Sequence, residues 1–217
     1  MEKLKKILNR IFIEGLSGMA LGLFATLIVG TIVGQIGTLI GGTPGKYICL
    51  VASVAKCMTS AGIGVGVAAK FKQTPLVTVS AAVAAMVGGY ASKIIAGALI
   101  AETGAVMLAG PGEPLGAFIA AYVAIEVGKL VAGKTSVDII VTPVVTIAVG
   151  SAVGLVVGPP ISGLMASLGS FINWATERQP VVMGIIIAVV MGMVLTLPIS
   201  SAALGIVLNL SGVAAGA

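Results

Sequence analysis

Three stretches of this chain contain no charged side chain, and each one is long enough to cross a lipid bilayer. They cover residues 15–45, 139–176 and 179–217. A transmembrane helix needs about 20 mainly apolar residues, whereas a transmembrane β-strand has about 9–11 residues that alternate between polar and apolar. Because the runs are continuously apolar, they predict an all-α fold, a polytopic bundle of transmembrane helices that forms a single membrane domain over residues 1–217.

The composition narrows the class of function. Hydrophobic residues make up 58% of the chain and its mean hydropathy is +1.19. We interpret the net charge of +5 as cytoplasmic loops that face anionic lipid, and expect the lipid bilayer and no nucleic acid as a partner. The absence of histidine excludes imidazole metal ligands and histidine-based catalysis or phosphorylation. We therefore expect no enzyme activity, metal or cofactor, and interpret Cys49 and Cys57 as small buried residues.

Turn residues and charges divide the chain into about six or seven spans. The expected spans cover residues 12–40, 47–69, 75–100, 115–132, 137–158 and 180–197. After Pro198, residues 198–217 are expected to form a seventh span or a broken, re-entrant segment.

Residues 161–177 have a different pattern. Their apolar side chains recur at the spacing of one helix face, and Trp174 suits the depth of a membrane interface. The pattern predicts an external amphipathic helix on the membrane surface, after a break at 158–160. The apolar face consists of Ile161, Leu164, Met165, Leu168, Phe171 and Ile172.

The basic residues predict the orientation, because cytoplasmic loops carry an excess of lysine and arginine. With a cytoplasmic N-terminus, of which residues 1–11 form an amphipathic surface segment, only Lys46 and Arg178 fall outside. The inside segments then hold Lys3, Lys5, Lys6, Arg10, Lys70, Lys72, Lys129 and Lys134.

Charged residues at membrane depth are candidates for function. Lys56 lies in the middle of the second expected span, and is either a lysine that faces a substrate pathway or one that is paired within the bundle. Lys93 is expected to extend to the interface. Glu126 and Lys129 are three residues apart on one helix, which allows a local ion pair.

Pro143 should kink the fifth expected span and free a backbone carbonyl. Asp138 lies one turn before Thr142, so these two residues predict a polar notch near the cytoplasmic end of the helix. The alternative is an ordinary proline kink without a binding role.

The densest group of polar residues is near the C-terminus. A proline-interrupted segment followed by small residues indicates broken helices around a binding site. Hydroxyl and amide groups there suit a sugar, and Glu177 could accept bonds from two sugar hydroxyls; alternatively Glu177 is an exposed residue paired with Arg178. The candidate substrate-binding residues of this group are Glu177, Gln179, Thr196, Ser200, Ser201 and Asn209.

Several motifs together resemble membrane proteins grouped as a second type of phosphotransferase-system enzyme IIC. They are FIEGLSGMALGLFAT (12–26), VDIIVTP (137–143), GPP (158–160), WATERQP (174–180) and LPISSAA (197–203). The resemblance implies a sugar permease of the bacterial inner membrane, a homodimer, with separate IIA and IIB components that phosphorylate the sugar. It also implies a further C-terminal part beyond residues 210–217.

Two other functions remain open at this stage. One is a channel or a transporter of an anionic substrate, which Lys56 would favour. The other is a membrane scaffold or regulatory partner that does not transport.

Overall fold

The computed structural model of the protein describes residues 8–101 and 104–195. Within these residues the regular secondary structure is helical, apart from an isolated β-bridge between Ile100 and Val106, and loops connect the helices. The predicted all-α class is confirmed for this part of the chain, as expected when apolar surroundings force backbone groups to bond within their own segment. The elements are the π-helical η1 (Arg10–Gly15) and η2 (Phe24–Ile28) and the α-helices α2 (Leu16–Leu23), α3 (Val29–Ile40), α4 (Gly42–Cys57), α5 (Thr59–Lys70), α6 (Pro75–Gly89), α7 (Ala91–Ile95), α8 (Pro114–Val131), α9 (Asp138–Arg178) and α10 (Pro180–Leu195).

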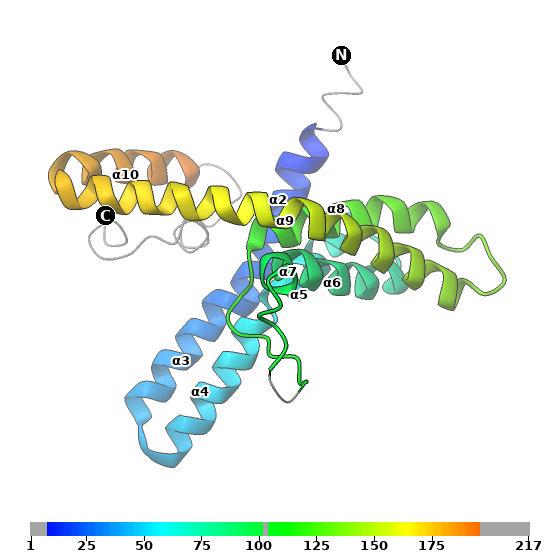
Figure 1. Cartoon of the computed structure of the whole chain (residues 1–217), viewed down its shortest axis with the longest axis horizontal. Helices are drawn as coiled ribbons and strands as arrows, with labels where there is room; N and C mark the ends of the chain where they lie inside the picture. Colours follow the sequence, from blue (N-terminus) through cyan, green and yellow to red (C-terminus); the bar gives the residue numbers. More distant parts are fainter. Residues whose placement is uncertain (1–7, 102–103, 196–217) are drawn as a thin grey trace.

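The first expected span is one long helix. From η1 to α3 the chain is helical without a break over Arg10–Ile40. It ends at Gly41, whose φ of 65° is a left-handed conformation that favours glycine. α4 then returns along α3, and this hairpin extends away from the rest of the molecule (Figure 1).

The second expected span is bent. α4 and α5 meet at Met58 with an angle of 52° between them. Lys56 therefore lies in the last turn of α4, beside an interruption of the helix and not in the middle of a straight span.

The third expected span, residues 75–100, is shorter than predicted. α6 has 15 residues and ends at Gly89, after which Tyr90 separates it from the short α7. At a rise of about 1.5 Å per residue α6 is about 22 Å long, less than the roughly 30 Å of a bilayer core. The expectation of one helix to residue 100 is wrong, because the chain turns out of α6 and the described residues 96–101 and 104–113 are not helical.

α9 corrects a second expectation. The helix predicted to end at 158–160 continues through Pro143, Pro159 and Pro160 to Arg178. Each proline removes one backbone hydrogen bond but keeps a helical φ, and helices in apolar surroundings tolerate such prolines. Residues 161–177 are therefore the second half of α9 and no separate helix; their location on a membrane surface stays a prediction.

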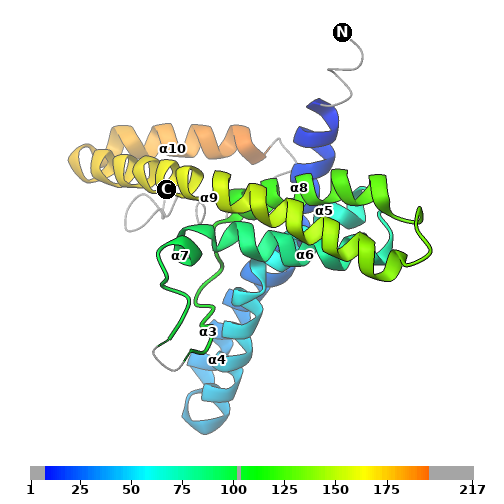
Figure 2. The same ribbon diagram turned by 45° about the vertical axis from the view of Figure 1, so that its right-hand side comes forward.

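The two halves of α9 pack differently. The first half lies along α6 and α8, whereas the second half extends away and is followed by α10 beside it (Figures 1 and 2). On this second half, Leu164, Leu168 and Phe171 of the expected apolar face are exposed, whereas its other three residues are half-buried. The segment 198–217 lies outside the described residues.

The core is built by close approach of helices with small side chains. α2 crosses α5 where Gly22 faces Gly62, and a Cβ atom at Gly22 would overlap the Gly62 carbonyl. α6, α8 and the first half of α9 pack together in the same way, with Gly154 against Gly88. Contacts of this kind drive helix association where lipid removes the hydrophobic contribution.

The described residues contain three helices that are long and apolar enough to cross a membrane, and four if the bent pair is one span. These are Arg10–Ile40, Pro114–Val131 and Asp138–Arg178, with Gly42–Cys57 and Thr59–Lys70 as the bent pair. A count of six or seven spans stays a prediction.

Candidate functional site

The polar centre of the fold lies where helices are interrupted. The α4–α5 bend at Met58 and the α6–α7 break at Tyr90 both face the loop that precedes α8. Such non-helical backbone is tolerated at membrane depth only where protein covers it or where it lines a cavity.

Four consecutive carbonyl groups of this loop, residues 108–111, are each held by a side chain from elsewhere in the chain. We call these residues the anchored loop. Directly after the loop, a backbone bond runs the other way: the N–H of Glu113 donates to the Gly89 carbonyl at the end of α6 at 2.6 Å. The side-chain donors and their acceptor carbonyls are Cys57 to Leu108 (3.2 Å), Lys93 to Ala109 (2.7 Å), Tyr90 to Gly110, and Ser60 to Pro111 (3.0 Å).

Two glycines allow this path. Gly110 and Gly112 have φ values of 78° and 74°, a left-handed region that costs glycine little. At Gly112 a Cβ atom would also lie 2.6 Å from the Ser60 hydroxyl oxygen. Substitution of Gly112 would therefore both strain the backbone and displace Ser60.

Glu113 follows the anchored loop and begins α8. Its carboxylate caps the helix, accepting from the N–H groups of Leu115 at 3.0 Å and of Gly116. Burial raises the pKa of Glu113, and the two bonds from Gly116 and Leu115 act in the opposite direction. Each carboxylate oxygen keeps a lone pair that a ligand hydroxyl could use.

Glu113 lines a cavity of about 670 Å³. Its lining comes from residues 109–112, from the first helix, from the end of α6 and the start of α8, and from α7 and α9. The polar side chains that line it are Thr31, Ser92, Lys93, Glu113 and Ser162. Lys93 keeps two ammonium hydrogens after its bond to Ala109. One carboxyl group, one ammonium group and three hydroxyls thus border the space, which suits an uncharged, hydroxyl-rich ligand.

Of the predicted site residues, Lys56 lies nearest to this centre. A Cβ at Gly30 would be 3.0 Å from Lys56 Cγ, so the stem of Lys56 packs on the first helix at Gly30, next in sequence to the cavity-lining Thr31. No ion pair to the Lys56 ammonium occurs within the described part of the chain. Its neighbour Cys57 holds the anchored loop.

Asp138 and Thr142 are brought together at the start of α9. Thr142 Oγ1 donates to Asp138 Oδ1 at 2.6 Å, and the Gly133 N–H donates to the same oxygen at 2.8 Å. This arrangement closes the α8–α9 turn. A binding role for the pair stays a prediction.

Glu177 and Gln179 lie at the opposite end of α9, about 60 Å from Asp138 by the helical rise. Both side chains are exposed. Arg178 lies 5.9 Å from the ring centre of Trp174, and no Glu177–Arg178 ion pair is formed among the described residues. The remaining predicted residues, Thr196, Ser200, Ser201 and Asn209, lie outside the described part of the chain.

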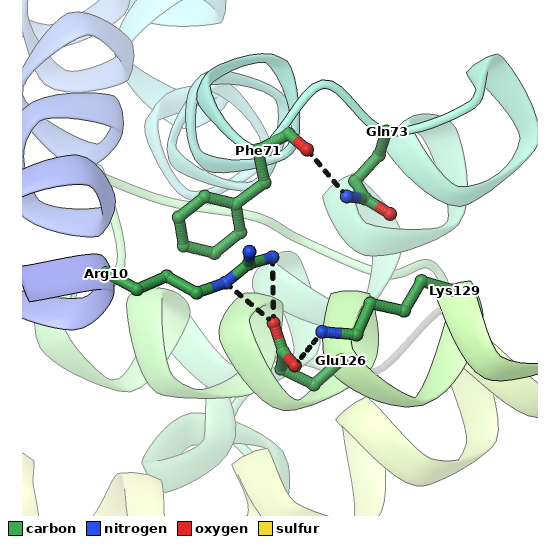
Figure 3. A network of polar contacts seen from close by, with 5 residues as sticks. All are labelled: Arg10, Phe71, Gln73, Glu126 and Lys129. Atoms are coloured by element: carbon green, nitrogen blue, oxygen red, sulfur yellow. Dashed lines mark hydrogen bonds and ion pairs between the residues drawn. The ribbon is translucent and has the colours of Figure 1, made fainter. Parts of the chain in front are cut away.

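A separate charged network joins segments far apart in sequence. Arg10 binds Glu126 through Nη2 at 3.0 Å and Nε at 3.1 Å, and Glu126 also pairs with Lys129, which confirms that local pair (Figure 3). The Arg10 guanidinium lies 4.2 Å from the ring centre of Phe71. The network fixes the start of the first helix to the ends of α5 and α8.

The sequence reasoning missed Glu113, Ser60 and Tyr90 as members of a site, and it assigned Lys93 to the interface. One signal was present: the string GPGEP at 110–114 places a carboxylate in a turn between two apolar runs. Nothing local links that turn to Ser60, 51 residues away.

Several of the described helices have the length and composition of membrane spans, and polar side chains border a cavity beside them, an arrangement typical of membrane transport proteins. The family model described as "Phosphotransferase system, EIIC" matches residues 13–217. No curated protein and no solved structure matches the chain.

The chain therefore belongs to the phosphotransferase system EIIC family. EIIC proteins are the membrane transport component of that system and are not catalytic, because phosphoryl transfer is done by other subunits. The family implies a sugar substrate and IIA and IIB partners.

Proposed function

We propose that this chain carries an uncharged carbohydrate across the bacterial inner membrane, and that the sugar binds in the cavity beside Glu113. The observation that carries the proposal is the cavity itself. Its volume of about 670 Å³ lies within the roughly 300–1,000 Å³ of small-molecule sites. Five polar side chains on an otherwise largely apolar lining could bind the hydroxyls of a sugar, while the apolar lining contacts its carbon atoms.

The charges around the cavity favour a neutral substrate. Glu113 would accept hydrogen bonds from sugar hydroxyls, and Lys93 would donate to hydroxyl oxygens. A sugar acid or sugar phosphate would bring a negative charge close to the Glu113 carboxylate. The two charged residues thus favour a sugar before phosphorylation over its phosphorylated product.

Ligand-induced thermal stabilisation tests this proposal, because a ligand that binds only the folded state raises the melting temperature. The purified protein would be heated in detergent with a panel of neutral monosaccharides, disaccharides and hexitols, and with sugar acids and sugar phosphates. We expect stabilisation by a neutral sugar and loss of the effect in Glu113→Gln. Stabilisation by sugar phosphates alone would contradict the proposed site.

The C-terminal polar group is the other proposed part of the substrate site. Glu177→Gln is the matched variant, since it makes the same chemical change at an exposed carboxylate near the C-terminal end of α9. We expect Glu177→Gln also to weaken sugar binding if the group of Gln179, Thr196, Ser200, Ser201 and Asn209 contributes. Unchanged affinity in this variant would remove Glu177 from the site.

A second candidate function is transport of an anion. The ammonium of Lys56, beside the α4–α5 bend, has no ion-pair partner among the described residues. This favours an anionic substrate, because an uncompensated charge at membrane depth is costly unless it has a function. In the same thermal assay, Lys56→Gln would abolish stabilisation by sugar acids or inorganic anions. Retained stabilisation by a neutral sugar in that variant would favour the first proposal.

Three further features complete the proposal: a homodimer, a cytoplasmic N-terminus, and a cytoplasmic location for the Arg10–Glu126–Lys129 network. Arg10, Phe71 and Glu126 come from three segments that the distribution of basic residues assigns to the cytoplasm. Their mutual contacts support one shared side.

A further inference from the structure

We infer that Ser60 and Tyr90 are positioning residues for sugar binding: neither lines the cavity, and each holds one carbonyl of the anchored loop that leads to Glu113. This inference rests on the proposed function, since it names two more residues that serve the same cavity. The inference goes beyond the proposed function because Ser60 and Tyr90 would affect sugar binding without touching the sugar.

The two hydroxyls are buried and directed at the loop. Ser60 is 0% and Tyr90 is 1% exposed. Ser60 Oγ donates to the Pro111 carbonyl at 3.0 Å, and Tyr90 Oη donates to the Gly110 carbonyl with a longer contact of 3.4 Å to the Cys57 carbonyl. Because both donors come from the two helix interruptions, the position of the loop depends on residues 20 and 51 positions away.

Packing leaves the loop little freedom while Ser60 is in place. The Ser60 hydroxyl lies between two glycines, and a Cβ atom at Gly89 would overlap it while one at Gly112 would be 2.6 Å away. The Glu113 N–H bonds to the Gly89 carbonyl at 2.6 Å directly beyond this point. Ser60 thus fixes the spacing between the end of α6 and the start of α8.

This spacing decides where the Glu113 carboxyl lies. Glu113 is two residues after Pro111, so a shift of the Pro111 carbonyl moves the start of α8 relative to the cavity. Removal of either hydroxyl leaves a loop carbonyl without its donor, and that cost is relieved only if the loop moves toward water or another partner. We therefore expect Ser60→Ala and Tyr90→Phe to loosen the loop and weaken sugar binding.

The native cysteines report on the loop without any ligand. Cys57 Sγ bonds to the Leu108 carbonyl, whereas Cys49 packs between α3 and α4 against Gly37. Both are free and half-buried. The ratio of their maleimide-labelling rates in the detergent-purified protein, measured by mass spectrometry, uses Cys49 as an internal reference.

We expect Ser60→Ala and Tyr90→Phe each to raise the Cys57-to-Cys49 ratio roughly two- to tenfold, the effect of one lost hydrogen bond. Ser80→Ala and Tyr122→Phe are the controls. Ser80 is 2% exposed and donates to the Leu76 carbonyl within its own helix. A ratio equal to that of the wild type in both test variants would overturn the inference.

The second measurement is the affinity for the sugar that stabilises the wild type. We expect a two- to tenfold weaker affinity in the test variants and an unchanged affinity in Ser80→Ala, even if that control melts at a lower temperature. A raised labelling ratio with unchanged affinity would overturn the positioning role. If no sugar stabilises the wild type, the proposed function fails, while an unchanged labelling ratio alone is enough to reject the anchoring by Ser60 and Tyr90.

Discussion

At the scale of single residues, Glu113 combines two roles that usually belong to different side chains. Its carboxylate caps α8 through Leu115 and Gly116, and the same group borders the cavity. A cap favours the ionised form, because N–H groups at a helix start stabilise negative charge. Burial disfavours it, and burial is the larger effect at this position.

This balance predicts how stability changes with pH. Because the folded state raises the pKa of Glu113 above its ordinary value of 4.5, the protonated form is favoured by folding. The contribution of protonated Glu113 to the stability of the folded protein is fully present below about pH 4.5. It is lost as the pH rises through the raised pKa of the folded state. As the pH is raised from 4.5 to neutrality, we expect the melting temperature of the wild type to decrease relative to that of Glu113→Gln.

The measurement is a thermal melt of both proteins in detergent at several pH values. Glutamine retains an oxygen that can cap α8 but has no titratable group. Parallel pH profiles for the two proteins would show that the charge on Glu113 does not limit stability.

At the scale of helices, close packing of glycines decides which helices meet. The α2–α5 contact depends on Gly22, Gly62, Gly18 and Gly66, where backbone touches backbone. Proline has less influence than its local chemistry suggests, since α9 continues through Pro159 and Pro160. The prolines inside α9 therefore set no helix boundary, whereas Pro75, Pro114 and Pro180 each begin a helix.

The prediction at this scale compares two helical glycines. Gly22→Ala should destabilise the protein by about 1–3 kcal/mol, the usual cost of overpacking, because its methyl group would overlap the Gly62 carbonyl. Gly163→Ala in α9 meets no atom within 4 Å and should be neutral or stabilise by roughly 0.5–1 kcal/mol. Melting temperatures of both variants check this, and equal effects would contradict the packing argument.

At the scale of the whole molecule, segments distant in the chain gather around Glu126. Arg10 from the first helix and Phe71 after α5 meet at this carboxylate on α8 (Figure 3). The Arg10 and Glu126 side chains are 32% and 28% exposed, so we expect this ion pair to contribute only about 0.5–1 kcal/mol. The ion pair matters mainly for geometry, because together with Phe71 it brings the start of the first helix, the end of α5 and the C-terminal part of α8 to one side of the molecule.

The distribution of basic residues predicts the orientation of the chain, and the contacts around Glu126 support one shared side for these three segments. The cysteine of Lys134→Cys, after α8, should react with an impermeant maleimide only in inverted vesicles. The cysteine of Lys46→Cys, near the start of α4, should react only in intact cells. Both substitutions would be made in a Cys49→Ser, Cys57→Ser background. Reaction of both positions from the same side would contradict the arrangement.

The sequence by itself determined the class of the protein and the outer limits of several helices. Its uncharged apolar runs demand helices, because no other local structure satisfies the backbone in lipid. Residue spacing alone likewise predicted the Glu126–Lys129 pair. These properties are local, so they can be read along the chain.

Only the tertiary structure decided where α6 ends, that α9 is continuous, and which polar residues share a site. The cavity depends on Ser60, Tyr90 and Lys93 bonding to a loop that lies 16 to 51 residues away from them. Such pairings arise because buried carbonyls must find donors once helices pack, and packing depends on contacts between distant glycines. No periodicity in the sequence records which distant donor a loop carbonyl will meet.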